Sequence, residues 1–90
     1  MPSVSFTGNL KRFYPDLKTM DVDAENVADL LENINEKFPG IKDYIVDETG
    51  KLRKHVNIFI GNEMISDPNK LTDLITDNDT IYIMQALSGG

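Results

Sequence analysis

The stretch from Asp23 to Gly40, DAENVADLLENINEKFPG, decides the fold because its apolar residues recur at the spacing of an α-helix. Asp23 is expected to cap the N-terminus, and Glu25 to place negative charge in the first turn, where the helix dipole favours it. Pro39-Gly40 should end the helix. Five apolar residues fall on one stripe of this helix: Val27, Leu30, Leu31, Ile34 and Phe38. We therefore expect one amphipathic helix that packs its stripe against the core.

Two strand-like segments precede the helix. Residues 4–7 alternate apolar and polar side chains, and residues 17–22 read as a second strand that pairs with the first as a hairpin with a long connection. The connection, residues 10–16, is predicted to be a loop or an irregular helical turn that folds Leu10 or Phe13 back onto the core.

Three further β-rich runs follow the helix, at residues 56–60, 63–65 and 80–84. Gly61-Asn62 should form a tight hairpin turn, residues 41–46 a short helical turn, and residues 71–75 a short capping segment. One helix among five strands predicts an α+β fold in which a mixed sheet of four to five strands carries the helix on one face. We expect a single domain over residues 1–84 and a flexible tail over residues 85–90.

Composition narrows the class of protein. Ninety residues suffice for one compact core, and the net charge of −6 argues against a nucleic-acid partner. The chain has no cysteine, which excludes disulfides, thiolate metal sites and cysteine nucleophiles. No apolar run approaches the ~20 residues of a membrane span, and the first residues lack a signal pattern. These features predict a cytoplasmic protein with no membrane partner.

The final residues, Gln85 to Gly90, read QALSGG and follow the last strand. A terminal diglycine has no side chain beside the carboxylate and can enter a channel with no room for a Cβ atom. Gly89-Gly90 therefore suits a protein whose own C-terminus is the reacting group. The simpler interpretation of the dipeptide alone is a frayed chain end.

The order of elements and the diglycine end resemble the ubiquitin-like β-grasp sulfur carriers of the MoaD/ThiS family. Residues 50–63, GKLRKHVNIFIGNE, resemble the family's basic stretch, Val-Asn strand and Gly/Asn turn, and residues 77–81, DNDTI, resemble its acidic turn into the last strand. The turn reads Gly61-Asn62 where the family more often has Asn-Gly, and residues 86–88 depart from its usual lead-in. The longer segment between helix and third strand is more similar to MoaD-like or CysO-like members.

The resemblance implies that a ubiquitin-activating-enzyme-like (MoeB/ThiF-like) adenylyltransferase uses ATP to adenylate the Gly90 carboxylate, with Gly89 beside it. Sulfur then replaces AMP, and the resulting thiocarboxylate donates sulfur. In MoaD members the thiocarboxylate donates sulfur to a pterin precursor bound to a larger MoaE subunit. The resemblance therefore implies, as the leading function, the small subunit of molybdopterin synthase in molybdenum cofactor biosynthesis. The chain itself would hold no cofactor or metal and would not be an autonomous enzyme. A protein modifier joined to lysines through Gly90, sulfur donation for cysteine, thiamine or tRNA, and a plain β-grasp binding domain are the alternatives.

Strand alternation predicts a docking surface beside the tail. If Val56, Ile58 and Ile60 face the helix, Phe59 faces outward, and the same alternation points Tyr82 and Met84 outward. The predicted partner-binding residues are Phe59, Tyr82, Met84, Leu87 and Ser88. Scattered exposed apolar side chains are the alternative.

One short basic run stands before the third strand. Lys51, Arg53, Lys54 and His55 could contact an acidic partner or a phosphate, although a solvated loop is the simpler interpretation. His55 has no catalytic or metal-ligand pattern around it, so we expect a structural role.

Overall fold

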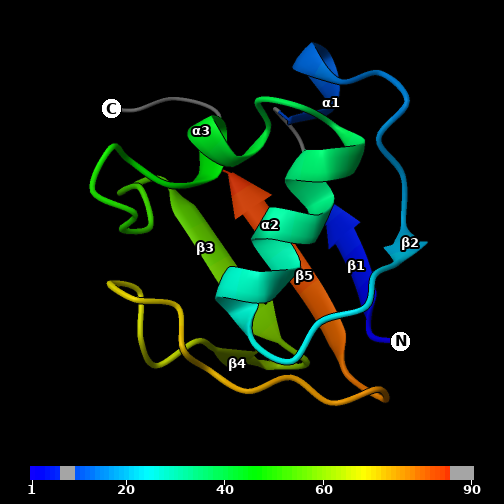
Figure 1. Cartoon of the computed structure of the whole chain (residues 1–90), viewed down its shortest axis with the longest axis vertical. Helices are drawn as coiled ribbons and strands as arrows, with labels where there is room; N and C mark the ends of the chain where they lie inside the picture. The colour runs from blue at the N-terminus through cyan, green and yellow to red at the C-terminus, as the bar shows by residue number, and fades with distance from the viewer. Residues whose placement is uncertain (7–9, 86–90) are drawn as a thin grey trace.

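The chain forms a sheet with one long helix across a single face, as Figure 1 shows. The computed structural model describes residues 1–6 and 10–85. The elements in chain order are β1 (Ser3–Phe6), α1 (Leu10–Phe13), β2 (Met20–Asp21), α2 (Val27–Lys37), α3 (Lys42–Ile45), β3 (Val56–Ile60), β4 (Glu63–Met64) and β5 (Thr80–Gln85). No helix of this described part is long and apolar enough to cross a membrane.

The sheet has five strands in the order β2-β1-β5-β3-β4. The first and last strands of the chain, β1 and β5, lie side by side and parallel, whereas the other neighbours are antiparallel. A mixed sheet closed by its last strand in the centre, with one helix on a face, is the predicted β-grasp arrangement. The prediction of the fold class is therefore confirmed.

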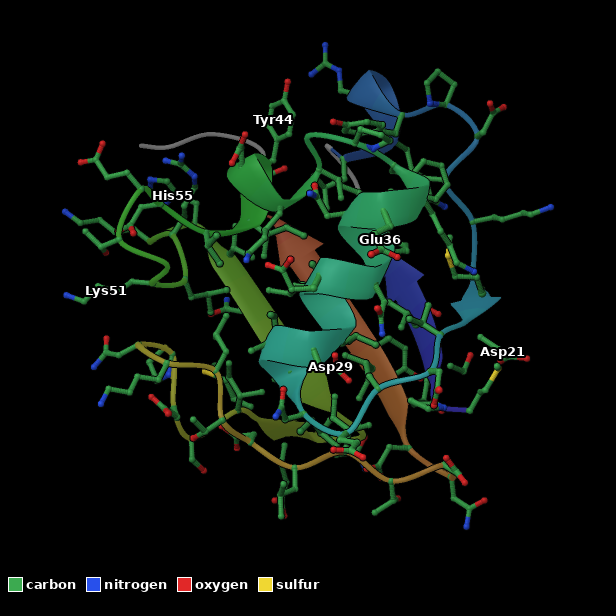
Figure 2. All side chains as sticks on the ribbon, in the orientation of Figure 1. Asp21, Asp29, Glu36, Tyr44, Lys51 and His55 are labelled. Atoms are coloured by element: carbon green, nitrogen blue, oxygen red, sulfur yellow. The ribbon has the colours of Figure 1, made fainter. Side chains whose placement is uncertain are left out.

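The core lies between α2 and the sheet. Four members of the predicted stripe are fully buried, namely Val27, Leu30, Leu31 and Ile34. The fifth, Phe38, lies one residue beyond the helix, where it is partly buried and packs edge-on against the Tyr14 ring at 6.1 Å. From the sheet, Ile58, Ile81 and Ile83 are fully buried against this stripe. Figure 2 shows Asp29 and Glu36 on α2 among the side chains that lie away from the sheet.

The N-cap of α2 is Asn26, so the prediction of Asp23 as the cap was wrong. The Asn26 Oδ1 atom accepts a hydrogen bond from the Asp29 backbone N–H at 2.8 Å, and the Asp29 carboxylate accepts from the Glu25 backbone N–H at 3.2 Å. This reciprocal pair resembles a capping box. Asp29, rather than Glu25, is the acidic residue of the first turn. The chain stays extended through Asn26 (φ −150°, ψ 175°), which is why helical spacing alone placed the cap too early.

The segment over residues 71–75 forms no helix, and it lies against the start of α2 through an isolated bridge between Leu74 and Asn26. The first helical N–H groups, of Val27 and Ala28, donate to the carbonyl oxygens of Asp73 and Leu71 at 3.1 and 2.9 Å. These donors have no partner within a helix, so the segment supplies partners that water would otherwise provide. Leu71 is buried at a positive φ of 59°, whereas Leu74 is 78 % exposed.

The remaining elements follow the prediction closely. The β1–β2 hairpin forms with two residues in β2, fewer than the predicted residues 17–22, and the Val22 N–H continues the pairing by donating to the Pro2 carbonyl oxygen at 2.9 Å. Leu10 of the connection reaches the core and has no exposed surface. The short turn α3 falls within the predicted residues 41–46, and β5 continues one residue further than expected, to Gln85.

Candidate functional site

The face of the sheet opposite α2 carries an exposed apolar surface at the end of the last strand. Along β5, Ile81 and Ile83 are fully buried, while Tyr82 and Met84 are 40 % and 42 % exposed. The alternation predicted for this strand is therefore confirmed. Both outward side chains lie immediately before the point at which the chain leaves the sheet, so this surface borders the tail.

Strand register extends this surface across β3 and β4. Phe59 of β3 pairs with Tyr82 of β5 on one side and with Met64 of β4 on the other. Phe59 is half-buried between these neighbours, and Met64 is 55 % exposed. We call Phe59, Met64, Tyr82 and Met84 the outer patch.

Met64 was missed from the sequence because the parity of its short strand was not assigned. The two-residue turn at Gly61-Asn62 fixes the register of this hairpin. Ile60 pairs with Glu63, so Met64 must lie opposite Phe59. Gly61 adopts a positive φ of 64°, a conformation that glycine takes at no steric cost.

The outer patch is hollowed rather than flat. An open depression of about 310 Å³ lies between Phe59, Gly61, Asn62, Tyr82 and Met84. Its walls are two aromatic rings and a flexible thioether, and the turn at Gly61-Asn62 closes one end. Such a depression can receive an apolar side chain of a partner, and Met and aromatic residues are enriched at protein interfaces.

The root of the tail is held against α3. Gln85, the last residue of β5, pairs with Val56, and its Nε2 group donates to the Tyr44 carbonyl oxygen at 3.4 Å. The predicted tail residues Leu87, Ser88, Gly89 and Gly90 lie outside the residues that the structure describes. The outer patch reaches the beginning of the tail only at Met84, while Phe59 and Tyr82 lie further toward the Gly61-Asn62 turn at the other end of β3. The roles of the patch and tail residues stay predictions.

Among residues 1–6 and 10–85, no group of three or more His, Asp or Glu side chains could hold a metal ion. The pKa of Asp47 lies below its usual value because the Thr49 hydroxyl donates to it, and the pKa of Asp67 is lowered in the same way by Thr72. Both carboxylates organise turns. The shifts therefore have structural causes.

Comparison with known proteins identifies the family. The model of the ThiS family matches residues 4–90, which is nearly the whole chain and includes the terminal diglycine. The chain belongs to the ThiS family. The match covers both the folded body and the tail, so this ThiS-family chain is a ubiquitin-like carrier protein of the sulfur-carrier class.

Three relatives illustrate where the chain lies among such proteins. It is 25 % identical over 75 residues to the sulfur carrier protein CysO of Mycobacterium bovis, which covers 81 % of both chains. It superposes on a chain of the BexX/CysO complex of Amycolatopsis orientalis with a TM-score of 0.84 and 24 % identity over the whole of both chains. The small archaeal modifier protein 1 of Methanosarcina acetivorans gives a TM-score of 0.78 and 26 % identity, with 98 % and 94 % of the two chains covered.

Proposed function

We propose that this protein carries sulfur as a thiocarboxylate on the carbonyl carbon of Gly90. The observation that supports the proposal is the family match, which continues through the diglycine to residue 90. In the proposed reaction the Gly90 carboxylate attacks the α-phosphate of ATP in an activating enzyme, and pyrophosphate leaves. A sulfide ion (HS⁻) then attacks the acyl carbon, AMP leaves with the former carboxylate oxygen, and one C-terminal oxygen has been exchanged for sulfur.

A carboxylate is a poor acyl donor because it has no good leaving group, and adenylation supplies one, so one difficult step becomes two easier ones. The activating partner supplies the ATP site. The five residues beyond Gln85 span at most about 16 Å at ~3.3 Å each, which is enough to enter a pocket while the folded body stays outside. The absence of a side chain at Gly89 and Gly90 keeps the acyl carbon accessible.

The folded body then has to hold the partner, and we assign this task to the outer patch. Two of its members, Tyr82 and Met84, come one to three residues before the tail begins, so a protein that binds the tail also faces the patch. A Phe59→Asp substitution places a charge in the wall of the depression and should weaken this association. The chain should still fold, because Phe59 is on the face opposite the core.

The comparisons bear on the destination of the sulfur. The relative from Mycobacterium bovis described above is the sulfur carrier protein CysO, and the fold of this chain superposes on a chain of a CysO-containing complex. This favours the acceptor of a CysO-like carrier over the MoaE-like subunit of molybdopterin synthase that the MoaD resemblance implied. A second candidate function is protein modification through Gly90, which the likeness to the small archaeal modifier protein supports.

Gly90→Ala tests the proposal. The added methyl group crowds the reacting carbon, so adenylation by the cognate activating enzyme, measured as ATP–pyrophosphate exchange, should fall sharply while the circular dichroism spectrum stays unchanged. Ser66→Ala, an equally small change in an exposed turn, is the control and should be adenylated normally. Normal adenylation of the Gly90 variant would contradict the proposal.

A further inference from the structure

A basic hollow lies at the end of the sheet where β5 gives way to the tail. It has a volume of about 510 Å³, and its walls come from the loop before β3 and from a neighbouring turn: Asp47, Lys51, Leu52, Arg53, Lys54, His55, Pro68 and Asn69. The register of the sheet fixes its place, because Val56, which follows this loop directly, pairs with Gln85. Figure 2 shows Lys51 and His55 on this loop, beside the turn α3 that carries Tyr44.

The loop that carries the charges is held on both sides. The Arg53 backbone N–H donates to the Ile45 carbonyl at 3.0 Å, and the Arg53 Nε group donates to the Asp43 carbonyl at 2.9 Å. On the other side, the Leu52 N–H donates to the Pro68 carbonyl at 2.8 Å. The backbone is therefore fixed between α3 and the turn at Pro68, and a partner meets a pre-formed arrangement of cations.

The charge of the hollow is opposite to that of the chain. Lys51, Arg53 and Lys54 are exposed, and the three cations with the single carboxylate of Asp47 give a net charge of +2 in a chain whose net charge is −6. The Asp47 carboxylate is turned toward its own loop, where it accepts from the Thr49 hydroxyl at 2.6 Å and from the Lys51 N–H at 3.1 Å. The two ion pairs found within the described residues involve neither Arg53 nor the two lysines.

We propose that the basic hollow docks an acidic surface on the protein that takes up the tail. This inference rests on the proposed function, in which that protein is the activating enzyme. The hollow lies at the end of β3 and β5 where Val56 pairs with Gln85, the last residue before the tail, so a partner that engages the tail meets the hollow. Met84 is the member of the outer patch nearest to this end. An acidic partner face would be repelled by the rest of this chain, and the +2 hollow turns the local field attractive and orients the encounter.

The form of the hollow favours a protein surface over a small phosphate ligand. Its cations are exposed to water, which weakens any single ion pair. Several carboxylates on a partner would interact with all three cations together and act over a longer range. Complementary charges of this kind raise the association rate more than they raise the strength of the final contact.

The test is the association rate of the full chain with its cognate activating enzyme. Lys51→Glu/Lys54→Glu should lower the rate constant about tenfold or more at ~0.01 M ionic strength, where the Debye length is about 30 Å. The difference should shrink at ~0.15 M, where screening acts within about 8 Å. Adenylation at saturating enzyme should keep the wild-type rate, because neither lysine approaches the reacting carbon in the proposed reaction.

The control variant is Lys18→Glu/Lys37→Glu, which changes the net charge equally at two exposed lysines, one just before the edge strand β2 and one at the end of α2. An association rate that falls equally in both variants would overturn the proposal, since overall charge alone would explain it. Amide shifts confined to residues 51–55 on addition of ATP without enzyme would also overturn it in favour of a phosphate site. Charge-dependent association without adenylation would support the hollow as a docking site and contradict the proposed function. The absence of any association would contradict both the docking role of the hollow and the proposed function.

Discussion

The alternation of β5 predicts that two adjacent residues, Ile83 and Met84, separate stability from docking. Ile83 is fully buried against α2, and Met84 is 42 % exposed on the outer patch. Truncation of either residue to alanine removes about three heavy atoms from the side chain. The two substitutions are thus matched in size and in place along the chain, and they differ in the face of the sheet that they change.

The structure gives different magnitudes for the two variants. Burial is worth about 0.8 kcal/mol for each CH₂ group, so Ile83→Ala loses about 2.4 kcal/mol of transfer free energy. The cavity left between the sheet and α2 raises the cost to about 3–4 kcal/mol. A chain of this length has a free energy of unfolding of roughly 5–13 kcal/mol, so this loss is a large part of the total. Met84→Ala should cost about 1 kcal/mol or less, because its side chain is on the solvent side.

Urea unfolding followed by circular dichroism measures both values, and association with the activating enzyme is measured on the same samples under folding conditions. We expect Ile83→Ala to shift the unfolding midpoint strongly with near-normal association of the folded fraction. Met84→Ala should leave the unfolding midpoint almost unchanged and weaken association with the activating enzyme. Equal destabilisation by the two substitutions would refute the assignment of faces, and normal association of the Met84 variant would remove this residue from the outer patch.

Two further predictions concern the turns that hold the body together. Asn26→Ala should lower the free energy of unfolding by about 1 kcal/mol, because it removes the acceptor for the Asp29 N–H. Asp23→Ala should lower it much less. Thermal unfolding compares the two variants, and equal losses of stability would contradict the assignment of Asn26 as the cap. The Thr72 hydroxyl lowers the pKa of Asp67 below its ordinary 3.8, so this contribution to stability is present above pH 3.8 and is lost as the pH falls through the folded-state pKa. Thr72→Val should therefore be less stable at neutral pH and lose less stability on acidification below pH 3.8, and parallel pH profiles of the variant and the wild type would contradict this.

The periodic segments were predictable because burial sets their pattern. The stripe of α2 and the alternation of β3 and β5 both follow from one buried face, and both were read correctly from the sequence. The position of the N-cap was not predictable in the same way. Asn26 becomes the cap because residues 71–75 hold the preceding chain extended, and this contact joins segments about 45 residues apart.

The candidate site likewise contains residues that the sequence pattern predicts and residues that depend on contacts between distant segments. Phe59, Tyr82 and Met84 follow from strand parity, and the diglycine is visible in the sequence. Met64 needed the register of a hairpin, which the turn at Gly61-Asn62 could have supplied. The basic run of the hollow was visible in the sequence, but the hollow itself was not, because its far wall at Pro68 and Asn69 comes from a turn that only the folded chain brings to the basic loop.

The most direct measurement of the central claim is the intact mass of the protein purified from its own cells. Loading of sulfur at Gly90 predicts a species heavier by the exchange of one oxygen for sulfur, with fragment ions that place the increase on the final residue. That species should disappear from a chain that lacks Gly89-Gly90. A protein that shows only the unmodified mass while its activating enzyme and sulfur source are active in the same cells would contradict the account.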